Sequence, residues 1–230
     1  MKYNIKVNEV KSEDSQLRAF ATVTFGDSLV VRNIAIIERR DNGTYFVSMP
    51  SYRTNEVTEK GEPIYRDICN PITKEFYEEL TKNILNAFEN RKSIGKEGLN
   101  VGENDPEALN FSVKVTPIER DDSSLRGIGR VFLNDRFVVG NVRLIEGEKG
   151  MFVSMPDYRT DRYKDGKPIY REIVFPITKE FREKLFGAFE KEYAAEKTKS
   201  KEKADPEPEK KQEKAISKKA KAEKEPALAR

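Results

Sequence analysis

The chain repeats itself, and this repeat limits what it can fold into more than any other feature of the sequence. Residues 46–54 read FVSMPSYRT and residues 152–160 read FVSMPDYRT, while PITKEF occurs at residues 71–76 and again at residues 176–181. Matches of this length in the same order do not arise by chance. Their spacing is about 105 residues, well above the 20 to 50 residues of solenoid repeats. We therefore predict two copies of one module, each with its own core.

The repeat divides the chain into four segments. We expect a first module over residues 1–90, a linker over residues 91–109, a second module over residues 110–193 and a tail over residues 194–230. The linker contains glycines and shows little hydrophobic periodicity. The tail is dominated by Lys, Glu, Ala and Pro. Because such a segment buries too little apolar surface to offset its ordering entropy, we expect it to be disordered, with a transient solvated helix as the alternative.

Each module begins with a pattern typical of antiparallel strands. Small or apolar residues alternate with polar ones from Leu17 to Phe25, and the second copy keeps this phase. A second strand is predicted with Val30, Ile34 and Ile36 on its core face. These segments favour a half-buried sheet.

A hairpin turn and a helix complete the module. An Asn-Gly pair within residues 39–44 predicts the turn. After PITKEF, apolar residues recur at every fourth position, as in Phe76, Leu80, Ile84 and Phe88 and, in the second copy, Phe181, Leu185 and Phe189. Thr73 and Thr178 are suitable N-caps for these helices.

We therefore predict an α+β fold. Each copy should contain a three- or four-stranded antiparallel meander and a crossover loop. A short extended segment, PIYRDI or PIYREI, should follow, and a C-terminal helix should lie on the sheet.

Composition excludes several kinds of site. The chain has no histidine, which excludes Ser-His-Asp triads, Cys-His pairs and His-ligated zinc. The single cysteine, Cys69, aligns with Val174 of the second copy, so we expect a small buried apolar side chain rather than a nucleophile. No pair of carboxylates has a spacing that suggests acid–base chemistry or metal binding. We predict a protein that is not an enzyme, with no catalytic residue, cofactor or metal.

Hydropathy and charge bear on location and partners. There is no apolar run of about 18 residues to span a bilayer, and the first ten residues alternate in polarity where a signal peptide is apolar. We expect a cytoplasmic protein without membrane insertion. The net charge is +3, but the basic excess lies in the tail. Nucleic-acid binding would need a local basic patch or the tail as a weak phosphate-seeking arm; alternatively the mixed charges are simply solvated.

The segment with the most chemical content follows each Met-Pro pair. A strand ends at the proline, and an aromatic and a basic side chain come next, Tyr52 with Arg53 and Tyr158 with Arg159. Arginine can donate two hydrogen bonds to a phosphate or a guanine edge, and tyrosine offers a stacking face. This combination is typical of nucleic-acid contact loops.

A purely structural interpretation of the same residues is also open. The tyrosine could pack on the sheet edge while the arginine pairs with Asp67, or with Glu172 in the second copy, in the next extended segment. Arg66 and Arg171 in that segment can be interpreted in either way. Both remain candidate nucleic-acid contacts.

These motifs resemble the SpoVG family, the stage V sporulation protein G or septation regulator family. In the first copy the resemblance runs from residues 17–19 through residues 30–31, 46–54, 65–68 and 71–72. In the second copy it runs from Leu125 through residues 152–160, 170–173 and 176–177. The family pattern FVxMPSxRT followed by FRDIxxPI is fairly specific. The resemblance covers most of both modules and none of the tail.

The resemblance implies a bacterial regulator linked to septation and sporulation that binds DNA and, in some members, RNA. A basic pair in the loop after Met-Pro-Ser is associated with DNA contact in the family. This role carries over to Arg53 and Arg159, whereas Tyr52 and Tyr158 replace the other basic residue. The implied partners are DNA, RNA and septation proteins.

Two further expectations concern assembly and mechanism. Family members are dimeric, so two linked modules are expected to pack as an intramolecular pseudo-dimer, with a higher oligomer as the alternative. A second functional hypothesis is a non-enzymatic protein-interaction adaptor in septum formation, because the folded part is near neutral in charge.

Overall fold

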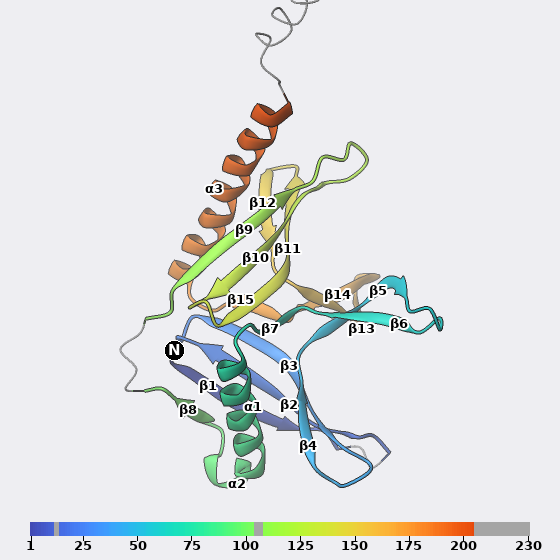
Figure 1. Ribbon diagram of the computed structural model, residues 1–230, viewed down its shortest axis with the longest axis vertical. Helices are drawn as coiled ribbons and strands as arrows, with labels where there is room; N and C mark the ends of the chain where they lie inside the picture. The colour runs from blue at the N-terminus through green and yellow to red at the C-terminus, as the bar shows by residue number, and fades with distance from the viewer. Residues whose placement is uncertain (12–13, 104–107, 205–230) are drawn as a thin grey trace, which may run out of the picture. The chain divides into compact units, whose positions relative to one another are not determined.

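The computed structural model describes residues 1–11, 14–103 and 108–204. Residues 1–193 form one compact unit, and the described residues 194–204 fall outside it. Within the compact unit, each copy of the repeat builds an antiparallel sheet (Figure 1). The predicted α+β fold is confirmed.

The sheet of the first copy is a meander whose neighbouring strands pair in chain order. Its strands are β1 (Tyr3–Glu9), β2 (Leu17–Phe25), β3 (Leu29–Glu38) and β4 (Tyr45–Ser48). The predicted turn lies between β3 and β4, where the Arg39 N–H donates to the Thr44 carbonyl at 2.7 Å. Alternation along β2 is also confirmed, since Ala19, Ala21 and Val23 are buried.

The second copy repeats this meander. Its strands are β9 (Phe111–Pro117), β10 (Leu125–Leu133), β11 (Phe137–Gly147) and β12 (Gly150–Ser154).

A β-bulge corrects the predicted phase of β3. Two residues of β3, Arg32 and Asn33, oppose a single residue of β2, and Asn33 has a φ of 64°. Asparagine adopts this left-handed conformation more readily than most residues. The bulge shifts the alternation by one residue, so Val31 joins Ile34 in the core cluster. Val30, which we had placed on that face, is buried but lies outside this cluster. Asn141 has a φ of 55° at the same place in β11.

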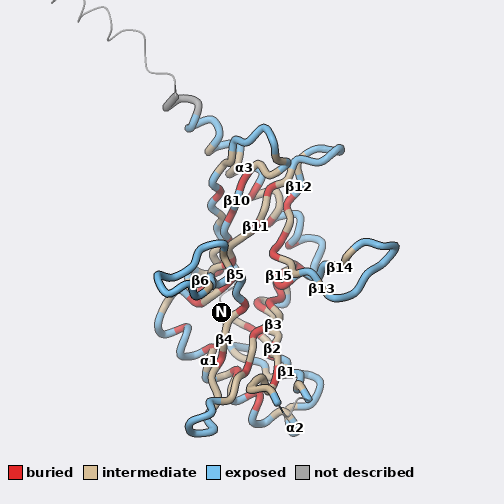
Figure 2. Tube along the Cα trace, turned by 90° about the vertical axis from the view of Figure 1, so that its right-hand side faces the viewer, coloured by how far each residue is buried: buried red, intermediate tan, exposed pale blue. Residues whose placement is uncertain are grey.

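The expected crossover loop and extended segment pair with each other. In the first copy β5 (Ser51–Val57) pairs with β6 (Pro63–Asp67), and in the second copy β13 (Asp157–Lys164) pairs with β14 (Lys167–Glu172). We call these the first hairpin and the second hairpin. Each is a two-stranded sheet of its own, and both stand away from the main sheets in Figure 2.

Short strands after the hairpins connect the two copies. Strand β7 (Cys69–Pro71) pairs with β11 of the second copy, and strand β15 (Val174–Pro176) pairs with β3 of the first. The rings of Phe25 and Phe137, one from each copy, lie 4.9 Å apart. Buried segments run through both sheets (Figure 2). We expected a separate core in each module, but the buried residues form one cluster because each copy completes the sheet of the other.

The predicted helices are present and capped as expected. Helix α1 (Lys74–Glu89) buries the predicted residues, and Thr73 accepts a hydrogen bond from the Phe76 N–H at 3.2 Å. Helix α3 (Lys179–Ala204) begins with the same contact between Thr178 and Phe181. No helix in the described ranges is long and apolar enough to cross a membrane.

The linker and the start of the tail contain more regular structure than the sequence indicated. Helix α2 (Arg91–Ile94) and strand β8 (Leu99–Val101) occupy the linker, and β8 pairs with β1. Residues 194–204, expected to be disordered, continue helix α3. Ala, Glu and Lys are strong helix formers, and the Lys199 ammonium lies 2.7 Å from the Glu196 carboxylate. Residues 205–230 of the predicted tail lie outside the described residues.

Candidate nucleic-acid interface

The register of each hairpin sets which of the candidate side chains share a face. Arg53 is paired with Tyr65 across the first hairpin, and Tyr52 is paired with Arg66. Because directly opposite residues of an antiparallel pair project from the same face, each hairpin carries one arginine–tyrosine pair on each side.

The second hairpin repeats this arrangement. Arg159 is paired with Tyr170, and Tyr158 is paired with Arg171. All six predicted site residues therefore lie in the two hairpins, at equivalent register positions.

The aromatic partners of Arg53 and Arg159 are more exposed than the tyrosines that precede these arginines. Tyr65 is 60% exposed and Tyr170 is 57% exposed, whereas Tyr52 is 37% exposed. Our sequence reasoning did not select Tyr65 or Tyr170 as site residues. Recognising the hairpin would have identified them, since the pairing places them opposite the arginines.

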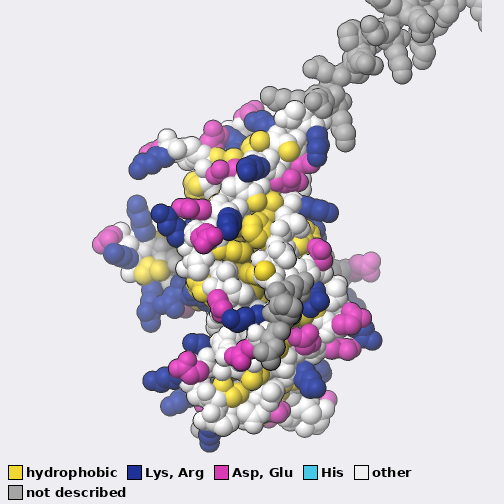
Figure 3. Space-filling model, turned by 90° about the vertical axis from the view of Figure 1, so that its left-hand side faces the viewer, with side chains coloured by type: hydrophobic (Ala, Val, Ile, Leu, Met, Phe, Trp, Pro, Cys, Tyr) yellow, Lys and Arg dark blue, Asp and Glu magenta, His cyan; other side chains and the backbone are white. Residues whose placement is uncertain are grey.

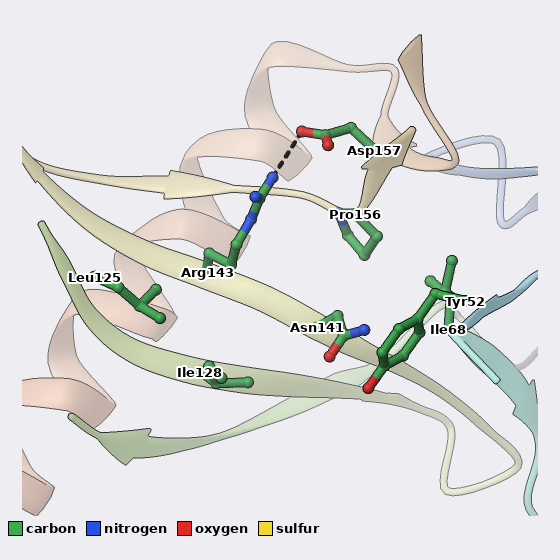
Figure 4. A pocket seen from close by; sticks show the side chains of 8 residues that line it. All are labelled: Tyr52, Ile68, Leu125, Ile128, Asn141, Arg143, Pro156 and Asp157. Atoms are coloured by element: carbon green, nitrogen blue, oxygen red, sulfur yellow. Dashed lines mark hydrogen bonds and ion pairs between the residues drawn. The ribbon is translucent and has the colours of Figure 1, made fainter. Parts of the chain in front are cut away.

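Tyr52 lies beside residues of the second copy while remaining partly exposed to solvent. It lines a pocket of about 270 Å³ together with Ile68, Leu125, Ile128, Asn141, Arg143, Pro156 and Asp157. In Figure 4 its ring lies beside Asn141 at one end, while Arg143 extends toward Asp157. The Arg143 guanidinium lies 2.7 Å from the Asp157 carboxylate. Tyr52 thus lines the same pocket as residues of β10 and β11 of the other copy.

Tyr158 is half-buried and packs against the core cluster. Tyrosines at this position can therefore orient the hairpins on the folded unit through their apolar rings. In this geometry Arg53–Tyr65 and Arg159–Tyr170 are the more accessible pairs for a ligand.

The arginines differ in their ionic partners. Arg66 donates to both carboxylate oxygens of Glu56, at 3.1 and 2.8 Å. In the described part of the chain, neither Arg53 with Asp67 nor Arg159 with Glu172 forms the ion pair that the structural interpretation of the sequence required.

Partial burial raises the pKa of the Asp67 carboxyl, since its charged form is less well solvated.

Arg159 has an aromatic partner within its own hairpin. Its guanidinium carbon lies 5.6 Å from the centre of the Tyr163 ring, and its Nη2 donates to the Tyr163 hydroxyl at 2.5 Å. A cation over an aromatic face is attracted by the ring quadrupole. This contact restricts the rotamers of Arg159 while leaving the residue exposed.

Cys69 is fully buried, as predicted from its alignment with Val174. Burial raises the pKa of its thiol well above the ordinary value because the thiolate would be poorly solvated. A thiol in this state is a poor nucleophile.

Two linked α+β copies that complete each other's sheets, each with an exposed hairpin carrying arginine and tyrosine, define a duplicated small β-sheet domain with paired surface hairpins. The SpoVG family model matches residues 1–90 and 110–195. The chain therefore belongs to the SpoVG family and contains the domain of that family twice. SpoVG septation proteins are not an enzyme family.

Similar proteins match about a third of this chain. Three similar proteins bear the name "Putative septation protein SpoVG". The protein of Borrelia hermsii is 43% identical over 74 residues, covering 32% of this chain and 72% of the relative. That of Lachnospira eligens is 37% identical over 89 residues, covering 36% and 94%. That of Phytoplasma australiense is 37% identical over 75 residues, covering 31% and 73%.

Proposed function

We propose that this chain is a regulator of the SpoVG type, linked to septation and sporulation, that binds DNA and also RNA through its two hairpins in the bacterial cytoplasm. The observation that carries the proposal is the exposed arginine–tyrosine pair at the same register position of both hairpins, Arg53 with Tyr65 and Arg159 with Tyr170. The names of the relatives support the link to septation.

The hairpin is a suitable element for this task. The major groove of B-DNA is wide enough to admit a two-stranded β-ribbon. An arginine can bind a phosphate or a guanine edge with two hydrogen bonds, and a neighbouring tyrosine can stack on a base of a single strand. Tyr52 and Tyr158 support the hairpins from the side of the folded unit, and Arg66 and Arg171 are further candidate contacts.

We also propose that the two modules act as an intramolecular pseudo-dimer. The support is the reciprocal pairing of β7 with β11 and of β15 with β3. A single chain then presents two hairpins, as a dimer of single-domain subunits would, without depending on protein concentration.

The test is a double variant, Arg53→Ala with Arg159→Ala, measured by fluorescence anisotropy on labelled duplex DNA and single-stranded RNA across a range of salt concentrations. Each lost phosphate contact should lower the slope of log affinity against log salt by about 0.9 on duplex DNA. Lys74→Ala with Lys179→Ala is a matched control, because it removes the same charge from equivalent exposed positions on the helices. Unchanged affinity and slope in the arginine variant would refute the assignment of these residues.

The alternative function is a protein-interaction adaptor in septum formation that does not bind nucleic acid. Helix α1 has an exposed groove lined by Tyr77, Thr81 and Leu85, among others, which favours a protein partner. Capture of septation proteins from a bacterial lysate, with and without nuclease, separates the two functions. Partners that survive nuclease treatment, with no direct binding of DNA or RNA by the purified chain, would favour the adaptor.

A further inference from the structure

The two hairpins have the same backbone pairing but differ in charge at equivalent positions. Val57 pairs with Pro63 in the first hairpin, and Tyr163 pairs with Pro168 in the second. This register makes Val57 equivalent to Tyr163 and, one residue earlier, Glu56 equivalent to Arg162.

Three replacements give the second hairpin a basic or aromatic side chain where the first hairpin has an acidic or aliphatic one. Glu56 corresponds to Arg162, Val57 to Tyr163, and Glu62, which precedes the shared proline, to Lys167. Two other replacements, Ser51 by Asp157 and Asn55 by Asp161, offset part of this change. Residues 51–67 therefore hold three basic and four acidic side chains, whereas residues 157–172 hold five basic and four acidic ones. The second hairpin is the more basic and the more aromatic of the two.

Ion pairing within the structure enlarges this difference. In the first hairpin the Arg66 guanidinium is occupied by both oxygens of Glu56. In the second hairpin the equivalent arginine, Arg171, has no ion pair in the described ranges, and neither has Arg162. One of the four acidic residues there, Asp157, is itself paired with Arg143 of strand β11. More of the positive charge of the second hairpin is therefore available to a ligand.

The Arg159 side chain of the second hairpin is also better preorganised for binding a ligand than Arg53 of the first. Tyr163 holds the Arg159 guanidinium by its ring and hydroxyl, whereas Val57 at the equivalent position of the first hairpin cannot do this for Arg53. A restricted side chain loses less conformational entropy on binding than a free one. The second hairpin, at the right edge of Figure 2, lies at the left edge of Figure 3, which views the molecule from the opposite side. Lys and Arg side chains gather on it there.

We propose that the two hairpins divide the work, so that the second hairpin supplies most of the contacts to the phosphodiester backbone of a nucleic acid and the first supplies few. Arg159, Arg162 and Arg171 form the contact surface, and Glu56 reduces binding at the first hairpin by occupying Arg66. This inference rests on the proposed nucleic-acid binding and adds that the two hairpins contribute unequally to it. The chain has one strong and one weak contact element, and therefore fits an asymmetric site.

The test uses the full chain and exchanges the charge at the equivalent positions, Arg162→Glu in one variant and Glu56→Arg in another. The probes are a labelled duplex of 20 base pairs and a single-stranded RNA of equal length, titrated at several salt concentrations. Arg162→Glu should weaken binding by about tenfold or more and lower the salt slope on duplex DNA by about 0.9 or more, because it removes one phosphate contact and adds a repulsive charge. Glu56→Arg should strengthen binding and raise the slope.

Matched truncations complete the design. Arg159→Ala should weaken binding several-fold more than Arg53→Ala does, although each removes one charge from the same register position. Melting temperatures of all variants establish that they fold, and both hairpins lie outside the core cluster at these positions.

Two outcomes would overturn the division of work. Equal losses for Arg53→Ala and Arg159→Ala, with no gain from Glu56→Arg, would overturn it while leaving nucleic-acid binding by the hairpins intact. Salt-insensitive or absent binding of both probes by the unmodified chain would overturn the proposed function and this inference together.

Discussion

In the first copy of the domain, helix α1 is fixed to the sheet partly by polar contacts. The Tyr3 hydroxyl donates to the Glu79 carboxylate at 2.8 Å and accepts from the Asn83 amide at 2.9 Å. In the second copy the three equivalent positions hold Phe111, Lys184 and Ala188, which cannot form this set of hydrogen bonds. The two helices occupy the same place in the repeat but are held by different chemistry.

In the second copy the contact between strand and helix differs from that of the first in the sizes of the packed side chains. Strand β10 has Gly129 where strand β2 has Ala21, and helix α3 has Phe189 where helix α1 has Ile84. A Cβ added at Gly129 would overlap the Phe189 ring. The strand has lost a methyl group and the helix has gained an aromatic ring, so the volume removed on one element is restored on the other. A duplicated fold thus tolerates divergence when the changes compensate within each copy.

The largest effect is expected where the two copies meet. Phe137→Ala should lower the free energy of unfolding by about 3–5 kcal/mol, because it removes a fully buried ring that contacts Phe25 of the other copy. Denaturant unfolding followed by circular dichroism measures the loss. Since both copies share one buried cluster, unfolding should remain a single transition.

Phe152→Ala is the matched control for that variant, since it removes the same ring from a residue that is 49% exposed. It should cost far less than Phe137→Ala. A separate transition for residues of the first copy, with an unchanged midpoint in Phe137→Ala, would contradict the idea of a shared core.

The compensating volume change in the second copy predicts a smaller effect. Gly129→Ala should cost about 1–3 kcal/mol through overpacking against Phe189. Adding Phe189→Ile, which recreates the pair Ala21 and Ile84 of the first copy, should recover part of this loss. Chemical denaturation of the two single variants and the double variant gives the coupling energy. Strictly additive effects would show that the two positions do not compensate.

The polar contact in the first copy predicts the smallest of the three effects. Tyr3→Phe keeps the buried ring but removes both hydrogen bonds of the hydroxyl, and should cost about 1–2 kcal/mol near neutral pH. Tyr77→Phe, at an exposed position, should cost much less. Equal effects of the two substitutions would argue against a role for the buried hydroxyl.

The same variant has a pH signature. Burial raises the pKa of Tyr3 in the folded state above the usual value of about 10. The stability that depends on the neutral hydroxyl is therefore fully present below pH about 10 and is lost as the pH rises further, because the unfolded chain releases the proton first. The difference in stability between the original chain and Tyr3→Phe should be constant up to about pH 9 and shrink as the pH is raised above about 10. A difference that stays constant throughout would contradict this linkage.

Much of the fold could be predicted from residue patterns of short range. The meander was predicted from the alternation along residues 17–25 and from the Asn-Gly turn, and the helices from the apolar residues at every fourth position after PITKEF. These features depend on neighbouring residues along one element. The phase of β3 was wrong at Val30, since the bulge at Asn33 depends on how two strands pair. Only one strand of each hairpin, β6 or β14, was recognised as extended, whereas β5 and β13 were expected to be crossover loops, and the pairing within each hairpin was not predicted.

The candidate site could also be predicted only where it depends on neighbouring residues along the chain. The sequence identified Tyr52, Arg53 and their equivalents as a chemically informative pair, and the structure placed them in exposed hairpins. It could not identify Tyr65 or Tyr170 as the residues opposite the arginines, because that relation arises only from register across a hairpin.

The sequence by itself determined that this protein is a duplication, which elements each copy forms and which loops carry arginine and tyrosine, because repeats and local periodicity are written along the chain. Only the tertiary structure decided that β7 and β15 cross between the copies and that one core serves both. A short strand records its own preference for extended structure but not the identity of its partner edge. That choice depends on long-range pairing, in which strand edges of either copy compete and the one that buries more apolar surface is formed.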